Sequence, residues 1–371
     1  MNAREDDIGN ANRQDAVAAG RDALARWRAD RPANWFTDNS GLRDLAVRYL
    51  PEDTQSAALE RLAAFGAEMV AAEAEVERCN LDPHLPQLAR WDGIGRRTEE
   101  VVFDPSYHTF GARLYGSGVM GLTGRPERAV EQAALVTLAS HHGEAGHVCP
   151  VACTAGMIGC IEHTGHDWLK ERYLPGLTDP NYATKLHGSQ FLTEVQGGSD
   201  VGSNACRAEL VASETSDRPA IWRIHGEKWF CSVIDASLFL ITARPEGAAA
   251  GSRGLGLFLV PRDPRDFPDE ARAAAGADEG VNAFTIRRLK DKLGTRGMAS
   301  GELDWNGSLA WQLGPLDRGI HNVVGIVLNT SRLFNAMACA GAMWRTWHEA
   351  ATFARNRDAL RRGARGDGEH L

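Results

Sequence analysis

The sequence contains no long uninterrupted apolar run. No segment reaches the roughly 18 consecutive apolar residues of a membrane-spanning helix, and the opening stretch MNAREDDIGNANRQD lacks the apolar core of a secretory signal. Cysteine is also scarce: seven residues are scattered along 371 positions. This excludes a disulfide scaffold and indicates thiols in a reducing compartment. We therefore expect no membrane association and a cytoplasmic location.

Positive charge is in short supply as well. Lysine and arginine number 41 against 49 aspartate and glutamate residues, which gives a formal net charge of -8. This balance argues against a surface built to neutralise a nucleic-acid backbone. The remaining composition is ordinary for a globular protein, with 43% hydrophobic and 24% charged residues, and 371 residues suffice for two or three domains.

Residues 21–188 have the periodicity of amphipathic helices. Leu62, Phe65 and Met69, for example, recur at spacings of three and four, which places them on one helical face. Residues 1–20 are polar and are expected to form a loose N-terminus. The sequence therefore predicts an N-terminal α-helical domain over 21–188.

In residues 189–312 the period shortens to two. Cys206, Ala208 and Leu210 alternate with charged neighbours, as expected for a strand with one buried face. Short continuous apolar runs, such as 255–260, have the length of buried strands. This region is predicted to form a compact antiparallel β domain.

The helical period returns over residues 313–357, which we interpret as the start of a C-terminal helical domain. Residues 358–371 are rich in glycine and charge and are predicted to form an irregular tail. The apolar residues of the helical part are expected to share one face against other helices, and they are Leu333, Met337, Ala340, Trp344, Trp347 and Ala351.

The segment Phe191–Ser203, FLTEVQGGSDVGS, is rich in groups that a packed core does not need. Gly197 and Gly198 let the backbone approach a flat or phosphorylated ligand, because no Cβ stands in the way. Thr193 and Ser199 place hydroxyl donors on either side of that pair. This composition favours a large polar cofactor, although each hydroxyl taken alone is more typical of a turn or a helix cap.

Two later segments complete a pattern: HGEKWFCS at 225–232 and RLKDKLGTRGMAS at 288–300. In this order and at these separations, the three segments resemble the acyl-CoA dehydrogenase family of flavoproteins, and most closely its adaptive-response, AidB-like branch. The resemblance extends from about Leu85 to Arg357 and is specific in its middle third. It implies an α+β fold with an N-terminal α-helical domain, a middle antiparallel β-barrel domain and the first part of a C-terminal helical bundle.

The resemblance also implies FAD as the cofactor. Isoalloxazine needs hydrogen-bond donors along its edge and flat contacts on its faces. In the family, the residue that matches Ser232 donates toward N5, the atom that receives hydride, and the residue that matches Phe230 meets the ring. Most members have Trp at that position, but Phe agrees with the AidB-like branch. The positions carried over as cofactor-binding are Gln190, Phe191, Leu192, Thr193, Gly198, Ser199, Phe230, Cys231, Ser232 and Arg357.

The reaction that the resemblance implies is α,β-dehydrogenation of an acyl thioester such as acyl-CoA, for which a carboxylate must remove the α-proton. In most members this base is a Glu near the C-terminus, on a segment that this sequence does not contain. In a minority it precedes an Arg that matches Arg332, and this sequence has Ser331 there. Glu194 is expected to hold its loop through backbone hydrogen bonds instead. We assign no catalytic residue.

We interpret the short C-terminal region as a truncation or frameshift. We expect an acyl-CoA dehydrogenase-like flavin oxidoreductase with weak or no FAD retention and with reduced or no activity. Family members of full length are expected to be homo-oligomers, whereas a chain without the whole bundle is not. The electron acceptor is not specified by the sequence. Arg357 matches an arginine that reaches the FAD phosphates of a neighbouring subunit, but a solvated residue at a helix end explains it equally well.

Two clusters of residues suggest other interpretations. The alternative within the same branch is an AidB-like, DNA-associated protective flavoprotein without significant dehydrogenase turnover, prompted by basic residues clustered between 287 and 296, but the acidic overall balance argues against nucleic-acid binding. Histidines and cysteines crowd between 141 and 166. They lack the two paired spacings of a structural zinc site and lie in an apolar, helix-like run, so we expect no metal.

Overall fold

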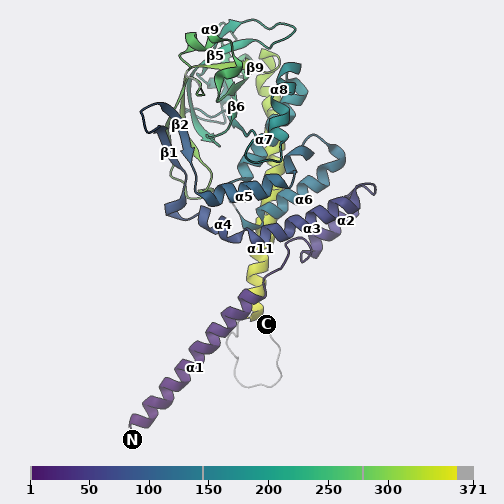
Figure 1. Cartoon of the computed structure of the whole chain (residues 1–371), viewed down its shortest axis with the longest axis vertical. Coiled ribbons are helices and arrows are strands. Elements are labelled where there is room, and N and C mark those ends of the chain that lie inside the picture. Colours follow the sequence, from purple (N-terminus) through teal and green to yellow (C-terminus); the bar gives the residue numbers. More distant parts are fainter. Residues whose placement is uncertain (1, 144–145, 278–279, 357–371) are drawn as a thin grey trace.

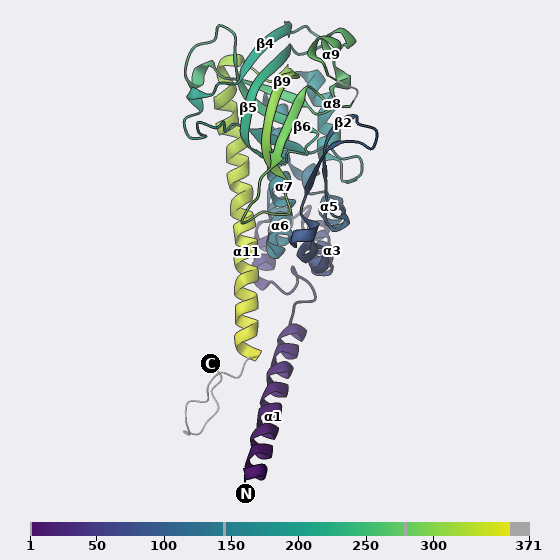
Figure 2. The same ribbon diagram turned by 90° about the vertical axis from the view of Figure 1, so that its left-hand side faces the viewer.

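The computed structural model describes residues 2–143, 146–277 and 280–356, with the backbone alone over 2–14. Two compact parts lie side by side along a long C-terminal helix: a helical domain and a β domain (Figure 1). Figure 2 shows this helix, α11, running along one side of both parts. Arg357 and the predicted tail 358–371 lie outside the described residues.

The helical domain packs around α7, which is buried on nearly every side and contributes Met157, Ile158 and Ile161 to the core. The predicted face of Leu62, Phe65 and Met69 is confirmed: all three side chains are buried. The helices are α1 (Asn2–Ala29), α2 (Ser40–Tyr49), α3 (Gln55–Ala71), α4 (Glu73–Cys79), α5 (Pro105–Gly116), α6 (Ala129–Ala139), α7 (Val148–Thr164) and α8 (Asp167–Thr178), with a hairpin of β1 (Gln87–Trp91) and β2 (Arg97–Val102) between α4 and α5.

The expectation of a loose N-terminus over residues 1–20 differs from the structure, in which α1 is helical from Asn2. The helix extends away from the body of the molecule in both views (Figures 1 and 2). Its C-terminal end is attached to α11, because the rings of Trp27 and Phe353 meet edge to face at 5.7 Å. Alanine and arginine are good helix formers, so the polar composition that suggested a loose end is compatible with a solvated helix.

The β domain is a seven-stranded sheet whose strands β6, β4, β5, β9 and β7 close into a barrel, because β7 pairs again with β6. The predicted barrel is confirmed, but it is not wholly antiparallel: β3 and β4 both run parallel to β6. The strands are β3 (Gly188–Phe191), β4 (Arg207–Ala212), β5 (Ile221–Ser232), β6 (Leu238–Pro245), β7 (Gly256–Pro261), β8 (Phe284–Leu289) and β9 (Ser300–Gln312), and the short helix α9 (Asp269–Ala275) lies between β7 and β8.

The C-terminal helix begins with α10 (Gly319–Asn322), continues through a π-helical turn over Val323–Leu328 and becomes α11 (Asn329–Asn356). The predicted apolar face is correct in part, because Met337 and Trp344 pack against the core of the helical domain. Leu333 and Trp347 are 57% and 62% exposed, whereas the neighbouring Phe334 is buried.

Gly341 supplies the physical reason for the difference in the covered face of α11. A Cβ at that position would lie 2.3 Å from the carbonyl oxygen of Thr137. The helix can approach the end of α6 only with this glycine turned inward, and that contact fixes which face is covered. The fully buried residues of α11 are Phe334, Gly341 and Thr352. Close packing against α6, more than hydrophobicity, determines which face of the helix is covered.

The described chain contains a single helical stretch, Leu316–Asn356, that by length and composition could cross a membrane. Its most apolar window has a mean hydropathy of 1.3, and 17% of that window is buried. The sequence lacks an uninterrupted run because polar residues such as Asn329 and Arg332 divide it. In this structure α11 packs against α6 and α7.

A cluster around Trp35 attaches α11 to the helical domain. Arg345 donates to Glu73 at 2.6 Å and lies 4.6 Å over the Trp35 ring. Trp344 meets the same ring edge to face at 5.5 Å, and His141 lies 4.7 Å from Trp344.

Burial lowers the pKa of His141 from 6.5 to about 4, although its hydrogen bond to the Thr137 carbonyl opposes that shift. The imidazole is therefore neutral in the folded protein near pH 7.

His147, directly before α7, is buried in the same way. Its Nε2 lies 2.9 Å from the carbonyl oxygen of Tyr107, and burial lowers its pKa from 6.5 to about 3. The unfolded chain takes up a proton as the pH falls below 6.5, but the folded chain does not until much lower pH. Stability that is complete above pH 6.5 is therefore lost progressively as the pH falls toward the folded pKa.

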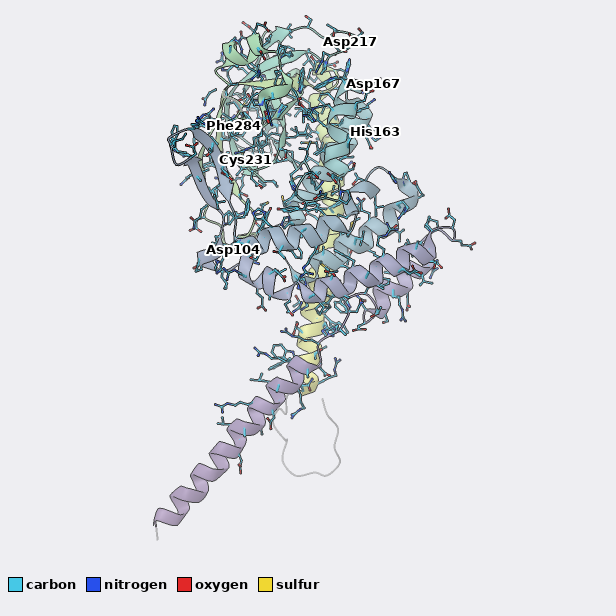
Figure 3. All side chains as sticks on the ribbon, viewed as in Figure 1. Asp104, His163, Asp167, Asp217, Cys231 and Phe284 are labelled. Carbon is cyan, nitrogen blue, oxygen red and sulfur yellow. The ribbon has the colours of Figure 1, made fainter. Side chains whose placement is uncertain are left out.

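We predict that His147→Leu flattens the pH dependence of stability. Between pH 7.5 and pH 5 the free energy of unfolding of the unsubstituted protein should fall by about 2 kcal/mol from this one imidazole, and the variant should lack that part of the decrease. Urea unfolding at the two pH values measures it. His163→Leu, at an exposed position of α7 labelled in Figure 3, is the control, and an equal slope in both variants would contradict the assignment.

Candidate functional site

The polar segment after β3 and the end of β5 lie next to each other. The backbone N–H of Trp229 donates to the carbonyl oxygen of Thr193 at 2.9 Å. This contact places Leu192 and Thr193 beside Phe230 and Ser232, so the two segments that carry most of the predicted cofactor residues form one surface. β3 itself is held in place by the parallel pairing of its four residues with β6.

A buried ion pair fixes the geometry of this surface. Lys228 Nζ donates to Glu194 Oε1 at 2.8 Å and to the carbonyl oxygen of Leu192 at 3.2 Å. Glu194 also accepts from the backbone N–H groups of Ala205 and Cys206, at 2.6 and 3.2 Å. The predicted loop-holding role of Glu194 is thus seen in the structure. Burial alone would raise the pKa of Glu194, but the charge and hydrogen bond of Lys228 keep it below its ordinary value.

The turn after Glu194 is tight enough to require glycine. Glu194 and Gly197 exchange backbone hydrogen bonds of 3.3 and 3.0 Å, and Gly197 has a φ of +145°, in a region that residues with a Cβ rarely adopt. A Cβ on Gly198 would lie 2.6 Å from Thr193 Oγ1. Gly197 is thus required by its backbone conformation, and Gly198 by its close approach to the Thr193 hydroxyl. Ser199 follows them on the exposed side of the turn.

The adjoining part of β5 offers a flat apolar contact and a hydroxyl. The Phe230 ring is 55% exposed, which is unusual for a phenylalanine in a folded domain. Lys290 Nζ lies 4.6 Å from its centroid and 4.1 Å from that of Trp229. Ser232, two residues further on, faces the same side of the strand as Phe230, and its Oγ lies 3.4 Å from the Oγ of Ser300 on β9.

The side chains of Phe191 and Cys231 do not reach this surface. Both are fully buried in the core of the β domain, where the Phe191 ring lies 5.3 Å from Phe239. Cys231 is labelled within that domain in Figure 3. Successive side chains of a strand point to opposite faces, so neighbours of the exposed residues must face inward, and only their main-chain atoms remain available to a ligand.

Gln190 connects the surface to α11. Its Nε2 donates to Ser331 Oγ at 3.0 Å, while its own Oε1 is buried and has no hydrogen-bond partner among the described residues. Ser331 is the position at which a minority of the resembling family carries its base, and it therefore borders the candidate site. Arg357, the remaining predicted contact, lies outside the described residues.

A hollow of about 590 Å³ opens beside the polar turn. Its wall is formed by residues 199–203 together with Gly251, Ser252 and Ile320. Arg244 holds this wall from behind, since its Nη2 donates to the carbonyl oxygen of Gly202 at 2.9 Å. The candidate surface thus continues from the exposed ring of Phe230, past the glycine pair, into a hydroxyl-lined depression.

The basic cluster between residues 287 and 296 is engaged in intramolecular contacts. Arg287 pairs with Glu227 and Asp304 at 2.6 Å each. Arg288 and Lys290 share Glu302, both at 2.9 Å, and the other two cations also have protein partners: Lys292 donates to the Met298 carbonyl and Arg296 pairs with Asp82. Four of these five cations are paired with carboxylates, which leaves less positive charge here to attract a phosphate backbone.

The histidines and cysteines between 141 and 166 have structural contacts in the described part of the chain, which holds no group of three or more possible metal ligands. The thiols of Cys149 and Cys153 lie 3.7 Å apart on successive turns of α7. Cys160 Sγ is 3.6 Å from Thr164 Oγ1. All seven cysteines are free thiols.

Comparison with known proteins identifies two domains in the chain. Residues 28–184 match the model of the adaptive response protein AidB N-terminal domain, and residues 189–307 match that of the acyl-CoA dehydrogenase middle domain. The chain is 33% identical over 277 residues to the putative acyl-CoA dehydrogenase AidB of Escherichia coli, which covers 71% of this chain and 46% of that protein.

Two comparisons point to a second relative. The chain is 29% identical over 327 residues to acyl-CoA dehydrogenase family member 11 of Caenorhabditis elegans, covering 84% of this chain and 49% of the relative. The crystal structure of Caenorhabditis elegans ACDH-11 in complex with C11-CoA superposes with a TM-score of 0.76 at 26% identity, over 87% of this chain and 53% of that one. The chain spans about half the length of the curated relatives it matches. With an AidB-type N-terminal domain followed by the characteristic middle domain, the chain belongs to the acyl-CoA dehydrogenase family.

Proposed function

We propose that this chain binds FAD on the surface formed by the turn after β3 and the end of β5, and that it acts as a flavin oxidoreductase on an acyl thioester. The acyl-CoA dehydrogenase of Bacillus anthracis, a solved structure with a similar fold, is complexed with FAD. The observation that carries the proposal is the hydrogen bond from Trp229 N–H to the Thr193 carbonyl, because it brings hydroxyl donors, an exposed aromatic ring and a glycine turn onto one face.

The residues present fit the cofactor in three respects. Phe230 presents a flat, exposed ring, which suits a planar heteroaromatic system. The hydroxyls of Thr193 and Ser232 offer hydrogen-bond donors to a polar ring edge. The glycine pair leaves a space that a Cβ at Gly198 would fill. Bound FAD would supply the hydride acceptor that none of the protein's own side chains can provide.

The proposed substrate class is an acyl-CoA or related thioester. The structure of the Caenorhabditis elegans relative contains C11-CoA, and the middle domain of the present chain belongs to the same family. In this chain the hydroxyl-lined hollow beside residues 199–203 continues from the flavin surface.

The proton acceptor for the α-carbon is the least complete part of the site. Glu194 is bound by Lys228 and by two backbone N–H groups, so its oxygens are committed to holding the turn. Glu302 is likewise engaged by Arg288 and Lys290. Ser331 borders the site but is no base near neutral pH. We therefore propose that dehydrogenation by this chain alone is slow.

A DNA-associated protective role is the alternative that the resemblance to the AidB-like branch implies. Its sequence support was the basic cluster between residues 287 and 296. The ion pairs of Arg287, Arg288 and Lys290 with neighbouring carboxylates remove much of that support. The flavin oxidoreductase is favoured for this reason.

We predict that the protein binds FAD reversibly and that Phe230→Ala weakens binding about tenfold, because the variant loses aromatic contact worth about 1.4 kcal/mol. Titration of FAD with protein, followed by quenching of flavin fluorescence, gives both dissociation constants. Trp91→Ala is the matched control, since Trp91 is 61% exposed but lies on the β1–β2 hairpin. Absence of saturable quenching by the unsubstituted protein would exclude this site for FAD.

A second prediction concerns Ser331. Ser331→Glu places a carboxylate beside the surface and still offers an acceptor to Gln190, so it should speed anaerobic bleaching of the bound flavin by an acyl-CoA. A general base contributes roughly 10²- to 10⁴-fold, and we expect an increase in that range.

Ser331→Gln is the isosteric control, because its amide cannot accept the α-proton. Equal bleaching rates for the Glu and Gln variants would show that this position does not lie close enough to the substrate carbon, while leaving FAD binding itself unaffected.

A further inference from the structure

A chain of three polar side chains ends at Ser232. Lys292 Nζ donates to Ser300 Oγ at 3.1 Å and to the carbonyl oxygen of Met298 at 2.6 Å. Ser300 Oγ in turn donates to Ser232 Oγ at 3.4 Å, at the long end of the range for hydroxyl groups. Ser232 and Ser300 are paired positions on the neighbouring strands β5 and β9, so the ladder itself holds the two hydroxyls adjacent.

The chemistry of lysine helps to set which group donates in each of these hydrogen bonds. An ammonium group has three donors and no acceptor, whereas a serine hydroxyl has one hydrogen and two lone pairs. Ser300 therefore accepts from Lys292, and it donates its own hydrogen to Ser232. Ser232 then receives a hydrogen bond and keeps its own hydrogen for a partner elsewhere. Among the described residues, none accepts that hydrogen in a hydrogen bond.

Burial strengthens the polarisation of these hydroxyl groups by the Lys292 charge. Ser300, the first residue of β9, is 2% exposed, and in such a buried position a hydrogen bond is electrostatically stronger than in water. Ser232 is only half-buried and lies at the edge of the candidate surface. A positive charge at the start of the chain polarises each hydroxyl in turn, so the outermost one becomes a better donor.

We infer that Lys292 is a positioning residue that, acting through Ser300, sets the Ser232 hydroxyl as a hydrogen-bond donor directed out of the protein toward N5 of the flavin. This inference rests on the proposed function, since the family resemblance matches Ser232 to the residue beside N5. The new element is the reason why the Ser232 hydroxyl donates a hydrogen bond outward and does not accept one. Without Lys292, the Ser300 hydroxyl could reverse, and Ser232 could then offer a lone pair to N5, which is itself an acceptor in oxidised flavin.

The test measures the hydrogen bond to N5 directly. FAD labelled with nitrogen-15 is bound to the protein, and the N5 resonance is compared with that of free FAD. In the unsubstituted protein a donor at N5 should displace this resonance upfield. We expect Lys292→Met, Ser300→Ala and Ser232→Ala each to lose at least half of that displacement, with flavin still bound.

Combined variants distinguish a chain from independent effects. If the three groups act in series, Lys292→Met together with Ser232→Ala should change the N5 resonance no more than Ser232→Ala alone, whereas unrelated structural damage would add. Lys292→Arg, which is also donor-only, should restore most of the displacement. Arg296→Met is the control. It removes a charge from the same loop, but Arg296 pairs with Asp82 and takes no part in the hydrogen bonds from Lys292 to Ser232.

The two hypotheses fail in different ways. If the unsubstituted protein does not bind FAD, the proposed function falls and the inference falls with it. If FAD binds but the N5 resonance is the same in Lys292→Met, Ser300→Ala and the unsubstituted protein, the inference is overturned while FAD binding stands. Additive shifts in the double variant would overturn it as well.

Discussion

The candidate flavin surface depends on the contact between Lys228 and Glu194. These residues come from different segments, β5 and the turn after β3, and both are almost completely removed from water. A charge buried in this way is tolerated only with its partner and further hydrogen bonds in place. Lys228 therefore also binds the Leu192 carbonyl, and Glu194 binds two backbone N–H groups. The polar turn has little freedom to move relative to β5, and a rigid surface of this kind suits a cofactor whose edge must be met at defined points.

Most residues of this surface could be predicted from the sequence, but the ion pair that holds the surface in place could not. Glycines, hydroxyls and an aromatic residue at Thr193, Gly198, Phe230 and Ser232 could be recognised because a ligand requirement differs from a packing requirement. The inward orientation of Phe191 and Cys231 could also have been predicted, since both alternate with exposed neighbours. Lys228 carried a weaker signal: a lysine at a core-facing position of a strand must have an acidic partner, but only the folded chain identifies Glu194 as that partner.

For the long helix α11, the apolar periodicity predicts a helix but does not predict which of its faces is covered. Its apolar residues predicted an amphipathic helix correctly, but the covered face was displaced in part, because Gly341 permits an approach to the end of α6 that no apolar side chain would allow. The same rotation directs Ser331 toward Gln190. Distances of this kind arise from the packing of segments remote in sequence, and neither composition nor spacing encodes them. The cross-strand position of Ser300 opposite Ser232 likewise follows from the register of β5 and β9.

The parallel pairing of β3 with β6 has a consequence for biosynthesis. A parallel partner cannot be reached through a tight hairpin, so Gly188 must wait for Leu238 before its ladder can form. β5 gains its principal neighbour only when β9 has emerged, as far as Gln312. During translation the helical domain can therefore compact first, while the strands that will carry the flavin surface remain unpaired on the ribosome. Until the last strand of the barrel is released, these edges are the part of the nascent chain most exposed to wrong partners.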